Sequence, residues 1–281
     1  MKFNPDSQLN IHELAVEEPE KKESGLSVDM QKYIDHETWK NMNDKLESFR
    51  NNNNWNRFIQ LGMNMKIIDP DIDFGIDDLA ITSIKDYLEF QRIQSLNQDN
   101  WSGFNLLSLG TKIIDPAIDI HIGVPAQQYL RNELKSFRDV GNWGAFARTA
   151  IEMQIFDAKA DIGIDDKATN GMTHKLEAYR KRGEWFSFIS LASDIKILGI
   201  NTDIKLDELE AKQGIKNQLE QSKNYGIKHG DWNDFGRFVR DIKILIAEKA
   251  EITDKGLEIT MPKEKESLQS DVPAIPEQKQ F

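Results

Sequence analysis

The sequence predicts a mainly all-α protein. We expect an α-solenoid-like array of helix–extended connector–helix repeats, each about 42–47 residues long, with a C-terminal β-hairpin cap. Two observations predict it: a tryptophan followed three residues later by phenylalanine recurs along the chain, and an isoleucine follows each of these tryptophans after twelve residues. The tryptophans are separated by 46, 42, 42 and 47 residues, which is typical of stacked two-helix units. The pairs are Trp55/Phe58, Trp101/Phe104, Trp143/Phe146, Trp185/Phe188 and Trp232/Phe235.

The first half of each unit is predicted to be an amphipathic helix that begins at the tryptophan. In the unit that begins at residue 185, apolar residues follow helical spacing along one face: Trp185, Phe188, Leu191, Ala192, Ile195 and Leu198. The recurrent isoleucines lie near the end of this helix: Ile67, Ile113, Ile155, Ile197 and Ile244. Gly199, or an Asp-Pro pair at Asp69-Pro70 and Asp115-Pro116, is expected to end it, because proline pushes the preceding residue out of the helical region.

A short alternating segment follows and opens with an aspartate eighteen positions after the tryptophan. Alternation of polar and apolar residues predicts an extended piece with one buried face. The four segments are Asp73–Ile76, Asp119–Ile122, Asp161–Ile164 and Asp203–Leu206. Second helices are then predicted over residues 78–93, 125–139, 166–181 and 208–224, with N-caps at Asp77, Asp165 and Asp207 and stops at Gly141, Gly183 and Gly230.

The ends of the chain depart from the repeat. We expect a disordered acidic tail over 1–28, a single repeat domain over 29–261 and a flexible polar tail over 262–281. The domain divides into a partial unit over 29–54 with a helix at 36–50, units that begin near 55, 101, 143 and 185, and a terminal unit over 232–261. In the terminal unit, alternating runs flank Asp254-Lys255-Gly256, which predicts a β-hairpin that covers the exposed end of the array.

Composition excludes several classes of protein. The chain of 281 residues has 36 Lys+Arg against 47 Asp+Glu, a net charge of −11, which argues against a general nucleic-acid binder. It has no cysteine, and therefore no disulfide or thiolate chemistry. No apolar run is long enough to span a bilayer, and the N-terminal residues lack the apolar segment of a secretory signal. We expect a cytoplasmic, monomeric protein without membrane contact.

No motif points to a catalytic, cofactor or metal site. The acidic run 69–78 resembles a calcium loop, but its sixth and twelfth positions, counted from Asp69, are Phe74 and Ala80 instead of the Gly and Glu that such a loop needs. We expect its aspartates to cap helices and face solvent. The histidines have no zinc-binding pair at helical spacing and are expected at the surface: His12, His36, His121, His174 and His229. The sequence therefore predicts no catalytic residue, no cofactor and no metal ligand.

The recurring aromatic and basic residues have structural interpretations. The Trp/Phe pairs share a helix face with the other apolar residues, which favours core packing over a ladder for stacking ligands. Cations near helix C-termini interact favourably with the helix dipole. Lysines recur near the end of the first helix and arginines near the end of the second: Lys66, Lys112, Lys196 and Lys243, and Arg50, Arg92, Arg138 and Arg180.

These patterns favour a non-catalytic helical-repeat scaffold that binds another, unidentified protein, because stacked repeats build an extended surface. Two alternatives stay open. One is an enzyme whose site is assembled from residues distant in sequence, and the other is a solenoid that binds a polyanion through its Lys/Arg columns. No column of the repeat changes its chemistry clearly enough to favour the enzyme.

Overall fold

The computed structural model describes residues 34–98, 100–118, 120, 123–206, 208–253 and 256–261, so the predicted tails over 1–28 and 262–281 lie outside the described residues. This part of the chain is mostly helical and ends in an antiparallel hairpin, as predicted. The helices are α2 (His36–Asn51), α3 (Trp55–Ile68), α4 (Asp78–Gln98), α5 (Ser102–Ile114), α6 (Val124–Val140), α7 (Trp143–Phe156), α8 (Asp166–Lys181), α9 (Trp185–Ile197), α10 (Leu209–His229) and α11 (Asn233–Ile246). The strands are β1 (Lys249–Thr253) and β2 (Gly256–Thr260).

The predicted helix caps are largely present. The side chains of Asp77 and Asp165 accept hydrogen bonds from the backbone amides three residues later, at 2.8 and 3.0 Å. Gly141 and Gly230 end α6 and α10 in the left-handed conformation. The predicted cap Asp207 lies outside the described residues, and α10 begins after Glu208 without a side-chain cap. Helices α4 and α10 run farther than predicted, because the longer segments before the next tryptophan continue each helix by about one turn.

The connectors differ from the predicted extended strands. Among their described residues, none belongs to a strand. Instead, three recurrent aspartates each accept a hydrogen bond from the backbone amide two residues later: Asp73 from Gly75, Asp161 from Gly163 and Asp203 from Lys205. In each case the residue whose amide donates this hydrogen bond has a φ between +51° and +64°. These are Asx turns, so the recurrent aspartate marks a turn and not a strand. The connector that begins at Asp119 lies partly outside the described residues.

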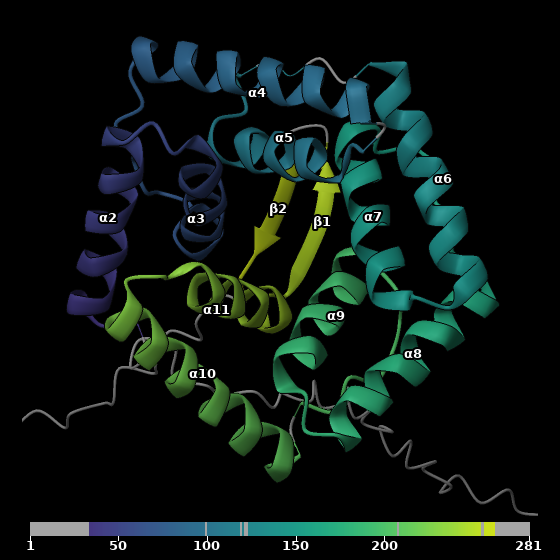
Figure 1. The fold of residues 1–281 in the computed structure, drawn as a ribbon. Coiled ribbons are helices and arrows are strands. Elements are labelled where there is room, and N and C mark those ends of the chain that lie inside the picture. Colours follow the sequence, from purple (N-terminus) through teal and green to yellow (C-terminus); the bar gives the residue numbers. More distant parts are fainter. Residues whose placement is uncertain are drawn as a thin grey trace, which may run out of the picture.

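Helices α2, α4, α6, α8 and α10 form an outer layer (Figure 1). Each buries one narrow stripe. In α6 the stripe is Ala126, Leu130 and Leu134, which share a helix face because they are spaced four residues apart. Equivalent stripes are Ala80, Ile84 and Leu88 in α4, Ala168, Met172 and Leu176 in α8, and Ala211, Ile215 and Leu219 in α10.

Helices α3, α5, α7, α9 and α11 form an inner layer that is buried on most sides (Figure 1). Each repeats one aromatic contact: the rings of the recurrent tryptophan and of the phenylalanine three residues later meet edge-to-face, with centroids 5.5–5.8 Å apart. Trp101 and Trp232 are almost fully buried, whereas Trp143 and Trp185 are half-buried against the core. The prediction that these pairs belong to the core is confirmed.

The inner helices close into a ring, which differs from the open array predicted from the sequence (Figure 1). Helix α3 packs on α5, α5 on α7, α7 on α9 and α9 on α11, and α11 then packs against α3. The last contact is close: a Cβ atom at Gly236 would lie 3.3 Å from the Cβ of Asn64 and from the Cε of Met42. The period of the repeat defines each unit, but the rotation from one unit to the next decides whether an array stays open or closes.

The recurrent lysines link neighbouring units of this ring. Lys112 Nζ donates to the carbonyl oxygen of Ile155 in the next unit (3.0 Å), and Lys196 donates in the same way to the end of α11. Lys243 of the last unit donates to Ile68 of the first and so completes the ring. The predicted contact between a cation and a helix C-terminus is therefore present, but for these three lysines it is made with the adjacent unit.

The arginines at the ends of the outer helices make a second set of links. They pair with the acidic residue that precedes the next outer helix: Arg50 with Asp77, Arg138 with Asp165 and Arg180 with Glu208. Where Gly123 replaces that acid, Arg92 pairs with Glu89 of its own helix instead. Because most of the recurrent cations hold units together, they do not form the free basic stripe that a polyanion would need.

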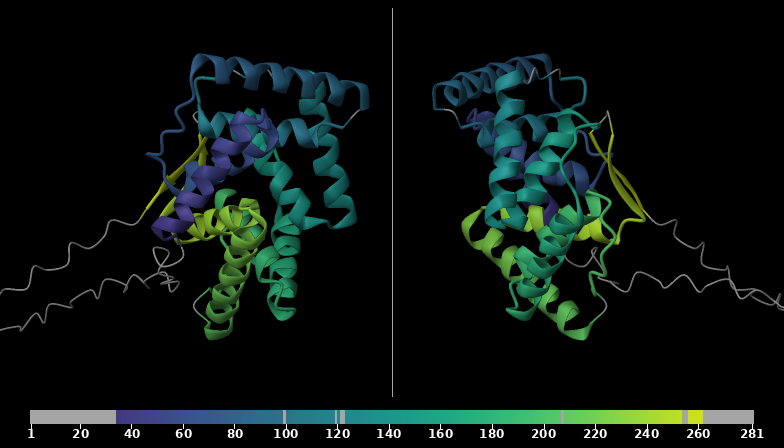
Figure 2. Two further views of the ribbon diagram at one scale, coloured as in Figure 1. Left: turned by 60° about the vertical axis from the view of Figure 1, so that its left-hand side comes forward. Right: turned by 90° about the vertical axis from the view of Figure 1, so that its right-hand side faces the viewer.

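The sequence predicts that the hairpin caps the last unit, but the hairpin covers residues of several units. It packs against α5, α7 and α9 and lies across one end of the ring (Figures 1 and 2). The apolar residues of α11 that an open end would expose, Phe235, Phe238 and Ile242, are buried, since α11 packs between α9 and α3. The turn residues Asp254 and Lys255 lie outside the described residues.

Candidate functional site

The interior of the ring is apolar at the end that the hairpin covers. This is the end at which the inner helices carry their recurrent isoleucines. The cluster comprises Ile67, Ile155, Ile197, Ile244 and Ala250, with Ile113, Ile252, Leu257 and Ile259 packed against it. The recurrent isoleucines of the units therefore pack together with the hairpin and fill one end of the interior.

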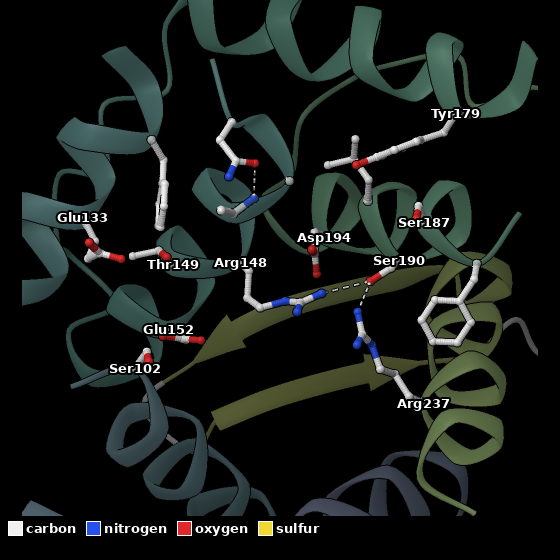
Figure 3. Close-up of a pocket in the computed structure, with 16 residues that line it drawn as sticks. Ser102, Glu133, Arg148, Thr149, Glu152, Tyr179, Ser187, Ser190, Asp194 and Arg237 are labelled. Atoms are coloured by element: carbon white, nitrogen blue, oxygen red, sulfur yellow. Dashed lines mark hydrogen bonds between the residues drawn. The ribbon is translucent and has the colours of Figure 1, made fainter. Parts of the chain in front are cut away.

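A cavity of about 360 Å³ lies nearer the beginning of the inner helices (Figure 3). Its charged walls come mainly from Arg148 and Glu152 on α7, Asp194 on α9 and Arg237 on α11. Arg148 and Glu152 are four residues apart, as are Ser190 and Asp194, so each pair lies on one face of its helix. Closure of the ring turns these faces toward the same interior.

Two arginines converge on one serine in this cavity (Figure 3). Arg148 Nη2 donates to Ser190 Oγ at 3.1 Å, and Arg237 Nη2 donates to the same oxygen at 3.0 Å. Among the described residues, no carboxylate oxygen lies within 4.0 Å of either guanidinium. The two charges therefore share a neutral acceptor and lack an ion-pair partner.

A third arginine nearby is fully engaged. Arg240 donates through Nε and Nη2 to Asp241 Oδ1, at 2.9 and 2.6 Å, and through Nη1 to Asn64 Oδ1 at 3.0 Å. Asp241 is 1% exposed, and its Oδ2 has no hydrogen-bond partner in the described part of the chain. This pair ties α11 to α3 and lies deeper than the cavity, beside a void of about 70 Å³ that separates the carboxylates from the isoleucine cluster.

Burial raises the pKa of two carboxyl groups in the cavity, those of Glu152 and Asp194. Burial raises the pKa of Glu152 to about 7, against a smaller opposing effect of Arg148 and with added repulsion from Asp194 and Glu133. Burial likewise raises the pKa of Asp194 to about 6, although Arg148, Arg240 and Arg237 lower it and Asp241 raises it. Groups with such pKa values can both release and accept a proton under physiological conditions.

Burial also affects the cationic side of the cavity. Burial, together with the neighbouring Arg148, lowers the pKa of Arg237 to about 10, although Asp241 and Asp194 act to raise it. The Arg237 guanidinium lies over the ring of Phe186, 5.0 Å from the centroid, and Phe186 in turn stacks on Phe238. The stacking fixes the guanidinium plane and replaces part of the hydration that burial removes.

Two columns of the repeat carry a signal that sequence reasoning missed. Five residues after the tryptophans come Gln60, Leu106, Arg148, Ser190 and Arg237, and nine residues after them come Asn64, Gly110, Glu152, Asp194 and Asp241. Both columns are neutral in the first two full units and become charged or hydroxyl-bearing afterwards. The expectation that no column changes its chemistry was therefore wrong. The change acquires a functional interpretation only through ring closure, because closure places these positions around one interior.

The residues that the sequence had weighed as site candidates lie elsewhere. Asp69, Asp73 and Asp77 each accept a hydrogen bond from a backbone amide two or three residues later, which agrees with the predicted turn and capping role. His36, His174 and His229 do not line the cavity beside Arg148. His12 and His121 lie outside the described residues.

No group of three or more His, Cys, Asp or Glu side chains among the described residues could hold a metal ion. No helix in that part of the chain is long and apolar enough to cross a membrane. Comparison of the chain with models of protein families, with curated proteins and with solved structures gave no match.

Proposed function

We propose that this protein binds a small polar molecule in the cavity inside its helical ring. The observation that carries the proposal is the convergence of Arg148, Glu152, Asp194 and Arg237, from three different helices, on one cavity. Glu152 and Asp194 are buried, Arg237 is half-buried and Arg148 is exposed. Burial of a carboxylate without an ion-pair partner lowers stability, and binding or catalysis is a common reason for retaining such a group. The cavity volume of about 360 Å³ matches the size of small-molecule sites, which begin at roughly 300 Å³.

The walls of the cavity combine features that suit such a ligand. Ser187, Ser190 and Thr149 supply hydroxyl groups, while Phe137 and Phe186 supply apolar surface. A few polar groups against an apolar background fix the orientation of a ligand and exclude molecules that cannot satisfy them.

A catalytic role is the second candidate, and the raised pKa values of Glu152 and Asp194 favour it. Two carboxyl groups that titrate near neutral pH in one cavity can act as general acid and general base. This corresponds to the alternative predicted from the sequence, an enzyme whose site is assembled from distant residues. The type of reaction depends on which molecule binds, so the ligand must be identified before a reaction is assigned.

The protein-binding scaffold predicted from the sequence also remains a proposal. Its extended surface was expected from an open array, and the closed ring removes that surface. A docking partner would instead use exposed apolar side chains on the outer layer, such as Phe90, Ile93 and Leu96 of α4. We rank this role below ligand binding because the cavity supplies both shape and charge, whereas these side chains supply apolar area alone.

A cavity-filling variant tests ligand binding directly. Gly144 lies in the first turn of α7 and lines the cavity, and a Cβ atom there would lie 3.8 Å from Tyr179 Oη, an ordinary contact. Gly144→Phe should therefore place a ring in the cavity without disturbing the helix. A library of small polar metabolites would be screened by thermal shift, and the hits would be measured by isothermal titration calorimetry. We expect hits that bind wild type and not Gly144→Phe.

The matched control is Gly103→Phe. Gly103 also lies in the first turn of an inner helix, but a Cβ atom there would meet nothing within 4 Å and the residue does not line the cavity. This variant should bind every hit as wild type does. Hits that bind equally well to Gly144→Phe, or a library without any hit, would count against the proposal.

A further inference from the structure

We infer that Arg148, Arg237 and Ser190 form a subsite for the oxyanion group of a small organic acid or phosphate ester. The inference rests on the proposed ligand binding and names the chemical class of the ligand. It follows from the geometry of two guanidiniums that donate to one serine hydroxyl in the cavity.

The hydrogen-bonding capacity of the three side chains points to an anion. Each guanidinium has five N–H groups, and Ser190 accepts only one from each. A hydroxyl oxygen that accepts two hydrogen bonds still has its own proton to donate. The free hydrogen-bonding groups of the trio are therefore all donors, and a carboxylate or phosphate is the ligand group that accepts several N–H and O–H bonds at once.

The charges point in the same direction. Two guanidiniums beside one neutral oxygen repel each other. Glu152 and Asp194 line the same cavity, but no carboxylate of the described residues lies within ion-pair distance of either arginine. Arg240, by contrast, donates hydrogen bonds to both Asp241 and Asn64. An anion between Arg148 and Arg237 would replace this repulsion by two charge-assisted hydrogen bonds.

Two members of the subsite, Ser190 and Arg237, are held in place before any ligand binds. Ser190 is 5% exposed and belongs to the buried middle of α9. The Arg237 guanidinium lies over the ring of Phe186, 5.0 Å from the centroid, and this ring stacks on Phe238 of α11. Donors that are fixed in advance lose little conformational entropy on binding, which is the usual basis of affinity for a small anion.

The test uses inorganic phosphate and acetate as probes of the two oxyanion types. Thermal midpoints and calorimetric titrations would be recorded for wild type, Arg148→Met, Arg237→Met and Ser190→Ala, with chloride at matched ionic strength and glycerol as a neutral probe. We expect phosphate or acetate to bind wild type and to bind each arginine variant about 10- to 100-fold more weakly, the loss of a charged hydrogen bond. Preference for phosphate would indicate a phosphate ester, and preference for acetate a carboxylic acid.

Two controls separate binding from folding. Arg92→Met removes an arginine that pairs with Glu89 on the outer layer, and it should bind the probes as wild type does. Without ligand, urea denaturation of Arg148→Met and Arg237→Met measures the effect of each substitution on folding, because each arginine repels the other but attracts Asp194. If either methionine variant does not fold, Ser190→Ala and Arg237→Lys provide the comparison. Ser190→Ala should lower the affinity for the anion. Arg237→Lys, which keeps the positive charge, should lower this affinity less than Arg237→Met does.

The outcomes distinguish this inference from the proposed function. Equal affinity of the anions for wild type and for both arginine variants, or no binding of either anion to wild type, would overturn the subsite. A neutral metabolite that Gly144→Phe excludes and that Arg148→Met binds unchanged would overturn the subsite while leaving ligand binding in place.

Discussion

Lys223 Nζ lies 2.8 Å from Asp35 Oδ2, although the two residues are 188 positions apart. Asp35 is the N-cap of α2, the first outer helix, and Lys223 is near the end of α10, the last one. This pair repeats, between the two ends of the chain, the link that Arg138 and Asp165 make between adjacent units. The outer layer is therefore closed as the inner layer is, by a contact of the same kind.

The Lys223–Asp35 link should contribute measurably to stability. Lys223→Met is expected to lower the free energy of unfolding by less than about 1 kcal/mol, because water screens a pair in which Asp35 is half-exposed. Urea denaturation would measure the loss, with Lys216→Met, an exposed position on the same helix, as a control without effect.

The pH dependence of this link has a defined direction. The Lys223 ammonium, together with the Thr38 hydroxyl and amide, holds the pKa of Asp35 well below its usual range. A depressed pKa stabilises the fold above the unfolded value of about 3.9, and this contribution is lost as the pH falls below it. The difference between wild type and Lys223→Met should thus shrink in acid; a constant difference would contradict the role of the ion pair.

Removal of the hairpin should affect the whole ring. A chain cut after Ala247 loses the apolar cover over Ile67, Ile155 and Ile244, which belong to units spread along the sequence. We expect a lower thermal midpoint in a single transition, together with binding of a dye that recognises exposed apolar surface. An open array would instead show local, graded damage confined to the last unit. Circular dichroism and dye fluorescence measured in parallel would separate these outcomes.

The indole of Trp143 packs so closely on Gly171 of α8 that it leaves no room for a side chain there. A Cβ atom at this position would lie 2.1 Å from Trp143 Cε2, so Gly171→Ala must displace the ring. We expect a loss of about 1–3 kcal/mol from overpacking, even though alanine favours a helix over glycine. The same substitution at Gly103, where a Cβ atom meets nothing, should be neutral or stabilising. Chemical denaturation of both variants gives the comparison, and stabilisation by Gly171→Ala would contradict the packing.

Trp143 itself should be costly to remove. Trp143→Ala deletes a ring that meets Phe146 edge-to-face and fills the notch at Gly171. Truncation of an aromatic core residue costs about 3–5 kcal/mol, and the half-buried position of Trp143 places the expected value near the lower end. A loss below about 1 kcal/mol would contradict the core role of this tryptophan.

Glu152 should make the protein less stable as the pH rises. Burial raises the pKa of this carboxyl to about 7 in the folded state, against an unfolded value near 4.3. A raised pKa means that the folded state holds the proton more tightly, so its contribution is complete in acid and falls between about pH 4 and pH 7. Glu152→Gln should remove this fall and be more stable than wild type at pH 8 by on the order of 4 kcal/mol. Denaturation at several pH values tests this, with the exposed Glu47→Gln as control.

Much of the local structure could be predicted from the sequence. The tryptophan period, the helices that begin at these residues and the caps at Asp77 and Asp165 all depend on neighbours within about one turn, and such contacts are visible as spacing. The hairpin was also predictable, because two alternating runs flank a turn. The connectors were misjudged, since alternation predicts an extended strand while the Asx turn at Asp161 and Gly163 forms the same pattern with one left-handed residue.

Ring closure and the cavity were decided by tertiary structure alone. The rotation between successive units is set by side-chain packing between helices, such as the approach of α11 to Asn64 at Gly236. The total rotation over all units decides closure, and residue spacing within one unit does not reveal it. The sequence contains Arg148, Ser190 and Arg237 in one column of the repeat, yet this column in an open array would line an extended face. Closure turns that face inward, and the two guanidiniums then meet at one hydroxyl because helices far apart in the chain have become neighbours around a common centre.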